Sequence, residues 1–92
     1  MFTKQQIESL DKEYFNILSA FAHIIVLQSR NTGHFWSITG TGYGDEVKIQ
    51  HKHNKSSPWH DQAFYIKCRH NLEGAIKAIK KHDMYILEKG DT

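Results

Sequence analysis

Residues Val47 to His53 alternate apolar and polar side chains, and this period of two restricts the fold more than any other feature. Successive side chains of a strand point to opposite faces. Val47 and Ile49 would therefore face a core, while the lysines beside them face solvent. A sheet with one covered and one solvated face is typically antiparallel. The segment predicts a half-exposed strand in an antiparallel sheet.

Two further segments have strand character. His34 to Thr39 predicts a strand that a glycine-rich hairpin loop, Gly40 to Gly44, joins to the alternating segment. Asn54 to Asp61 contains the only proline and reads as a second connection. Ala63 to Cys68 then predicts a third strand.

The N-terminal part of the chain predicts a long helix. Thr3 and Gln6 fit a capping box. Apolar residues recur after it at steps of three and four up to Ile24 or Ile25, which favours one helix to about residue 29. In the alternative, the helix ends near Ala22 and the β-branched stretch after it forms a strand. Residues 30–33 would then be a hairpin turn.

The C-terminal part predicts a second helix. Asn71 is a suitable N-cap, and Leu72, Ala75, Ile76 and Ile79 form an apolar stripe. A short last strand from Met84 to Leu87 could follow. The sequence thus predicts a single α+β domain over residues 1–92, of order α-β-β-β-α with an optional β. Its antiparallel sheet would be packed by a long N-terminal helix and a C-terminal helix.

Length, charge and cysteine content set the class of protein. Ninety-two residues suffice for one domain, and 39% hydrophobic against 24% charged residues is a globular composition. A single cysteine and the absence of a signal peptide or apolar span at the N-terminus favour a cytoplasmic location without membrane association. The net charge of +2 is uneven, because residues 1–46 carry −2 and residues 47–92 carry +4.

The seven histidines are the most unusual feature of the composition. His51 and His53 are two residues apart and would share a strand face, so they could ligate one metal ion. His60 or His34 would supply the third nitrogen of an open zinc site. The alternative makes His51 a hydrogen-bonded edge residue of the buried face and leaves His53 and His60 in solvent.

The second half of the chain mixes basic and aromatic residues in a way that favours binding. The residues concerned are Lys48, Lys52, Lys55, Trp59, His60, Tyr65, Lys67 and Arg69. Those on the predicted strands would give a basic outward face with aromatic groups for stacking. Such a face suits phosphates, bases or an acidic protein surface; the alternative is an ordinary solvated face.

These patterns lead to three functional hypotheses. The first is a non-catalytic module that binds nucleic acid or a nucleoprotein, of the kind found among accessory or inhibitory factors of phages and mobile elements. The second is a histidine-rich, zinc-dependent hydrolase. The third is a homo-oligomeric interaction domain, because the apolar stripe of the long first helix exceeds what one small core needs. The sequence contains no complete nucleophilic triad, so it names no catalytic residue.

Overall fold

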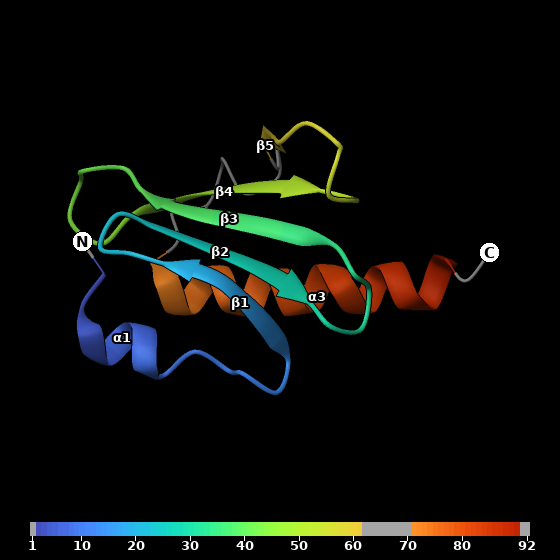
Figure 1. Ribbon diagram of the computed structural model, residues 1–92, viewed down its shortest axis with the longest axis horizontal. Coiled ribbons are helices and arrows are strands. Elements are labelled where there is room, and N and C mark those ends of the chain that lie inside the picture. Colours follow the sequence, from blue (N-terminus) through green and yellow to red (C-terminus); the bar gives the residue numbers. More distant parts are fainter. Residues whose placement is uncertain (1, 62–70, 91–92) are drawn as a thin grey trace.

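The computed structural model describes residues 2–61 and 71–90, which form a small α+β domain (Figure 1). A short helix comes first, five strands follow, and a long helix ends the described chain. The elements are α1 (Lys4–Glu8), β1 (Phe15–Ala20), β2 (Ile24–Ser29), β3 (Phe35–Gly40), β4 (Val47–Lys52), β5 (His60–Asp61) and α3 (Leu72–Gly90).

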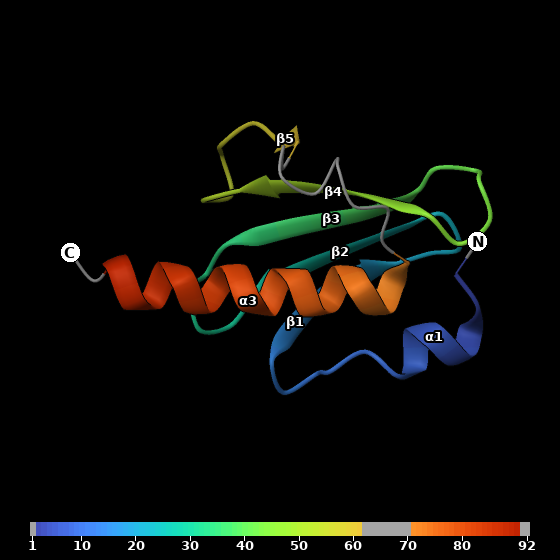
Figure 2. The same ribbon diagram turned by 180° about the vertical axis from the view of Figure 1, so that it is seen from behind.

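The sheet is an antiparallel meander in which every strand pairs with its neighbour in sequence. The order is β1-β2-β3-β4-β5, and β5 adds only two residues to the four six-residue strands. Helix α3 crosses one face of this sheet, behind it in Figure 1 and in front of it in Figure 2. Among the described residues no helix covers the other face.

The predicted long N-terminal helix is wrong. Its capping box is present, since Gln6 N donates to Thr3 Oγ1 and Thr3 N to Gln6 Oε1, but the helix ends at Glu8. Backbone N–H groups of residues 13 and 14 donate to Asp11 Oδ1 in a turn that redirects the chain into β1. The surplus apolar stripe behind the oligomer hypothesis is therefore absent, and that hypothesis stays a prediction.

The alternative interpretation of this region was partly correct. The β-branched stretch forms β2, and the turn at residues 30–33 is a hairpin in which Gly33 has a φ of 79°. Both interpretations missed β1, because Tyr14, Ile17, Leu18 and Phe21 recur at the steps of three and four that are typical of a helix. The β-bulge between Ile17 and Ser19 shifts the register and obscures the period of two.

Most of the predicted elements after residue 33 that the structure describes are confirmed. Strands β3 and β4 and the glycine loop between them are confirmed. The predicted strand from Ala63 to Cys68 lies outside the described residues. The helix after Asn71 is confirmed, with Gly74 N donating to Asn71 Oδ1 over 2.8 Å, but it runs to Gly90, so the strand from Met84 to Leu87 is wrong. No described helix is long and apolar enough to cross a membrane.

The core lies between α3 and the inward face of the sheet. Its central members have no exposed surface and alternate along β2 and β3 with half-buried or polar residues; they are Ile25, Leu27, Trp36 and Ile38. Helix α3 adds Leu72, Ala75 and Ile79 from its predicted stripe. Register aligns Leu27, Trp36 and His51 in one inward row across the sheet.

Replacing a central core leucine tests this arrangement. Leu27 is 0% exposed and Leu87, on α3, is 49% exposed. Leu27→Ala should lower the free energy of unfolding by about 2–5 kcal/mol, because it removes buried contacts and leaves a cavity. Leu87→Ala should cost less than about 1 kcal/mol. Urea denaturation followed by circular dichroism measures both; equal losses would contradict the described core.

Candidate metal centre

Five histidines gather where the inward face of the sheet meets α3. His51 lies in β4, and β5 places His60 opposite it in register. His34 and His53 flank the facing ends of β3 and β4, which pair from Phe35 with Lys52 onward. His82 reaches the group from α3, within 5.4 Å of the His51 ring, centroid to centroid.

Three of these imidazoles form a compact triad, namely His34, His51 and His53. One ring nitrogen from each lies within 4.8 Å of the others, and His34 Nδ1 is 3.0 Å from His51 Nε2. The His34 and His53 rings stack at 4.7 Å, and the His51 and His53 centroids are 5.0 Å apart. The triad spans the range from buried through half-buried to exposed, since His51 is 2% exposed and His53 lies in solvent.

His60 and His82 stand outside the triad but beside it. The His60 centroid is 5.6 Å from that of His51 and 6.3 Å from that of His53, in edge-on arrangements. His82 meets both His51 and Trp36 edge-on. They could act as proton carriers or further ligands around an ion held by the triad.

Three of the five histidines, His34, His51 and His82, have a lowered pKa. Burial, reinforced by the neighbouring histidines, lowers the pKa of His51 to about 3. Burial also lowers the pKa of His34 and of His82, and the charge on Asp83 opposes that decrease in both. Near neutral pH the His34 and His51 rings are uncharged, and in the contact between them one nitrogen donates and the other accepts.

Next to the histidines lies a buried hydrogen-bond network centred on Asp83. Asp83 Oδ2 accepts from Tyr14 OH at 2.8 Å and from Ser29 Oγ at 2.5 Å, and Oδ1 accepts from Thr32 Oγ1 at 3.3 Å. Ser29 Oγ in turn accepts from Trp36 Nε1 at 3.1 Å. The Trp36 ring stacks on His51 with centroids 4.2 Å apart, which connects the network to the triad.

The structure brings together the histidines that the sequence singled out. His34, His51 and His53 form the triad, and His60 lies beside it. His51 also continues the buried face of β4, so both interpretations of that residue describe its position. Sequence reasoning assigned no role to His82 or to Asp83, and Asp83 is 0% exposed. The helical stripe passing through Ala75 and Ile79 reaches position 83 after four more residues, and that spacing could have revealed it.

Of the described residues predicted to bind, Lys48 and Lys52 lie on the other face of β4, Lys55 and Trp59 lie in the loop after it, and His60 lies beside the triad. Lys48 is exposed, and Lys52 Nζ lies 5.4 Å from the Phe35 ring centroid and 4.6 Å from that of Trp59. Lys52 Nζ also donates to the carbonyl of Lys55. Tyr65, Lys67 and Arg69 lie outside the described residues, so the second half of the predicted face stays a prediction.

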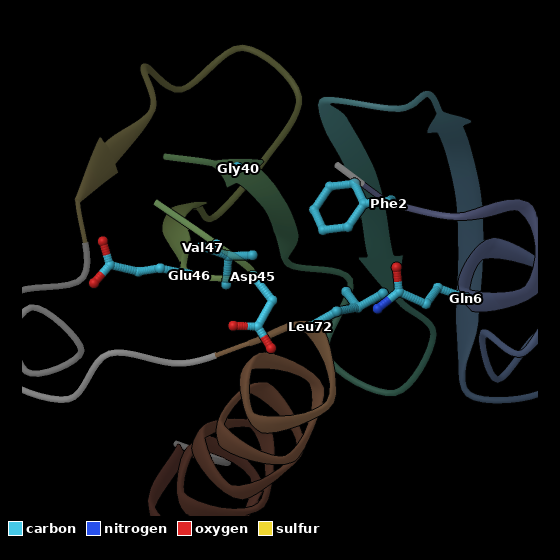
Figure 3. Close-up of a pocket in the computed structure, with 8 residues that line it drawn as sticks. Phe2, Gln6, Gly40, Asp45, Glu46, Val47 and Leu72 are labelled. Carbon is cyan, nitrogen blue, oxygen red and sulfur yellow. The ribbon is translucent and has the colours of Figure 1, made fainter. Parts of the chain in front are cut away.

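Two cavities lie away from the histidines. The pocket of Figure 3, at the opposite end of the sheet, has an apolar floor of Phe2, Val47 and Leu72, with Asp45 and Glu46 beside it. Its volume of about 20 Å³ suits a water molecule rather than an organic ligand. A groove of about 370 Å³ between α1 and α3 is lined by mixed charges, including the 3.1 Å ion pair of Lys80 with Asp11.

Comparison with known proteins adds no candidate: no family model, curated protein or solved structure matches this chain.

The lowered pKa of His51 predicts acid sensitivity. The unfolded chain takes up a proton near the ordinary value of 6.5, whereas folded His51 does so at about 3. Between these values the unfolded state binds more protons, so the free energy of unfolding should fall as pH falls through this window. Urea titrations from pH 7 to pH 4, with chelator present, measure the slope.

The same substitution made at two histidines tests whether His51 causes the dependence of stability on pH. His51→Gln should flatten the dependence of stability on pH, whatever it does to stability at neutral pH. His23→Gln, in the exposed turn between β1 and β2, should leave the slope unchanged. Equal slopes in the wild-type and His51→Gln proteins would show that His51 titrates normally.

Proposed function

We propose that this domain is a metal-binding protein that holds a divalent transition-metal ion, Zn²⁺ above all, on His34, His51 and His53. The observation that carries the proposal is the convergence of three imidazole nitrogens within 4.8 Å. Ligands in tetrahedral zinc sites are about 3.3 Å apart when each Zn–N bond is about 2.05 Å. Small rotations of the exposed His53 ring would bring the triad to that spacing.

The protonation state of the triad supports the same assignment. A histidine binds a metal only as the neutral imidazole, so protons compete with the ion. Because burial lowers the pKa of His34 and of His51, both rings need lose no net proton at neutral pH. The hydrogen in the contact between them would move to the other nitrogen of its ring when the ion binds. An all-imidazole set suits Zn²⁺, Cu²⁺ and Ni²⁺ rather than Mg²⁺ or Ca²⁺, which prefer oxygen.

Three protein ligands are the number found in catalytic rather than structural zinc sites. Such an ion keeps a position for water and lowers the pKa of that water, which supplies hydroxide for hydrolysis near neutral pH. His53 and His60 are both exposed, so the site would be reached from their side. A hydrolytic reaction is therefore the activity that this centre would support.

Metal analysis of untagged protein tests the proposal. Protein purified without chelator should carry close to one zinc per chain, and the chelated protein should take up one Zn²⁺ in calorimetry with a rise in melting temperature. Cobalt substitution should give the visible absorption of a tetrahedral site. A chain that binds neither ion would contradict the proposal.

A matched pair of variants locates the ion. His53→Ala removes an exposed ligand and should weaken Zn²⁺ binding by more than about 100-fold, since outer-sphere changes alone cost 10- to 100-fold. His23→Ala removes an exposed histidine from a distant turn and should bind as the wild type does. Equal binding by both variants would place the ion elsewhere.

The outward face of the sheet supports a second candidate function, the binding of single-stranded nucleic acid or another polyanion. The supporting observation is the contact of Lys52 with the rings of Phe35 and Trp59, which puts a cation and two aromatic groups together on a face that no described helix covers. Bases can stack on such rings while lysines contact phosphates. This face is opposite the histidine cluster, so both functions could exist in one chain.

Removing charge from that face tests the second candidate. Lys48, Lys52 and Lys55 changed together to Ala should weaken the binding of a labelled single strand and lower its salt slope by about 2, because each phosphate contact contributes about 0.7. Lys4, Lys77 and Lys81, exposed on the two helices, provide a charge-matched control. Fluorescence anisotropy at several salt concentrations measures both; equal losses would reveal only a net-charge effect.

A further inference from the structure

Asp83 is an ionisable group that the proposed triad does not use, and its environment is unusual. It is 0% exposed, and its carboxylate accepts hydrogen bonds from three hydroxyl groups. None of the ion pairs among residues 2–61 and 71–90 includes it. A buried carboxylate is costly unless hydrogen bonds or an opposite charge compensate it. The hydroxyl groups supply the first form of compensation and no charge.

The position of Asp83 connects it to the histidines in two ways. Through Ser29 Oγ it fixes the Trp36 indole, whose face lies against His51. It also directly follows His82 on α3, and the His82 ring meets the His51 ring edge-on with centroids 5.4 Å apart. The carboxylate is therefore close enough for its field to reach the cluster.

The triad itself lacks a negative charge. Three neutral imidazoles would leave the full charge of a dication uncompensated at a site where His51 is buried and His34 half-buried. In a medium of low dielectric constant a nearby carboxylate then stabilises the ion strongly. Outer-sphere carboxylates have this role in many metal sites.

We propose that Asp83 is a positioning residue and the counter-charge of the metal centre, acting on the ion without ligating it. The hydroxyl groups of Tyr14, Ser29 and Thr32 hold the carboxylate in place by their hydrogen bonds, and Trp36 carries its orienting effect to His51. This inference rests on the proposed metal function.

The test compares Zn²⁺ affinity in the wild type and in Asp83→Asn, which keeps the size of the side chain and removes its charge. The variant should bind Zn²⁺ about 10- to 100-fold more weakly. Tyr14→Phe removes one hydrogen bond from the carboxylate and keeps the charge, so it should stay within about 3-fold of the wild type.

A monovalent ion separates charge from structure. The effect of a counter-charge scales with the charge of the ion, so Asp83→Asn should weaken Ag⁺ binding by only about the square root of the Zn²⁺ effect, roughly 3- to 10-fold. If Asp83 had only a structural role, Asp83→Asn would weaken the binding of Zn²⁺ and of Ag⁺ by the same factor. That result would overturn the role of Asp83 as a counter-charge. The pair Asp83→Glu and Asp83→Gln, equal in size, repeats the comparison should Asp83→Asn unfold; only the glutamate should retain affinity.

The outcomes also separate this inference from the proposed function. If the wild type and Asp83→Asn bind Zn²⁺ with equal affinity, the proposed role of Asp83 is wrong, but the proposed metal centre is unaffected. Wild-type protein that binds no Zn²⁺ would overturn both.

Discussion

The hydrogen bonds to the Asp83 carboxylate join the two layers of this domain. They attach α3 to Tyr14 just before β1, to Ser29 at the end of β2, and to Thr32 in the turn that follows. Apolar packing alone would leave a 19-residue helix free to slide along a flat sheet face. Hydrogen bonds to a buried group are directional, and breaking them leaves a charge unpaired. This constraint fixes the register of α3, and with it the approach of His82 to the sheet.

The inward face of the sheet changes character along its length because of that arrangement. Toward one end the rows are apolar, as in the alignment of Ile25, Ile38 and Ile49. Toward the other end Trp36 gives way to the histidines, where the polar part of α3 lies opposite. Histidine suits such a boundary, since its ring packs like an aromatic group and its nitrogens still need partners. The register of the strands thus brings several imidazoles together, although the sequence contains no known metal-binding motif.

The sequence predicts the parts of this structure whose pattern has one interpretation. The alternation in β4 fixed which residues face the core, and it placed His51 and His53 together. The first 29 residues carry apolar positions that satisfy both periods, and only pairing between β1 and β2, with its bulge, decides in favour of strands. Met84 to Leu87 look like a strand in isolation, but α3 continues through them. Asp83 was missed because a lone carboxylate beside a histidine is usually solvated, and its three hydroxyl donors come from distant segments.

The same geometry separates two kinds of histidine chemistry. A proton sensor needs a pKa near physiological pH, and burial among other imidazoles moves His51 away from that range, to about 3. A metal centre needs nitrogens that converge on one point, and His34, His51 and His53 each place one within 4.8 Å of the others. The surroundings that disfavour a proton on His51 keep its ring neutral, and the neutral imidazole is the form that binds a metal ion. The arrangement therefore supports the proposed metal centre rather than a pH sensor, and under that proposal the neighbouring carboxylate would favour a cation at this place.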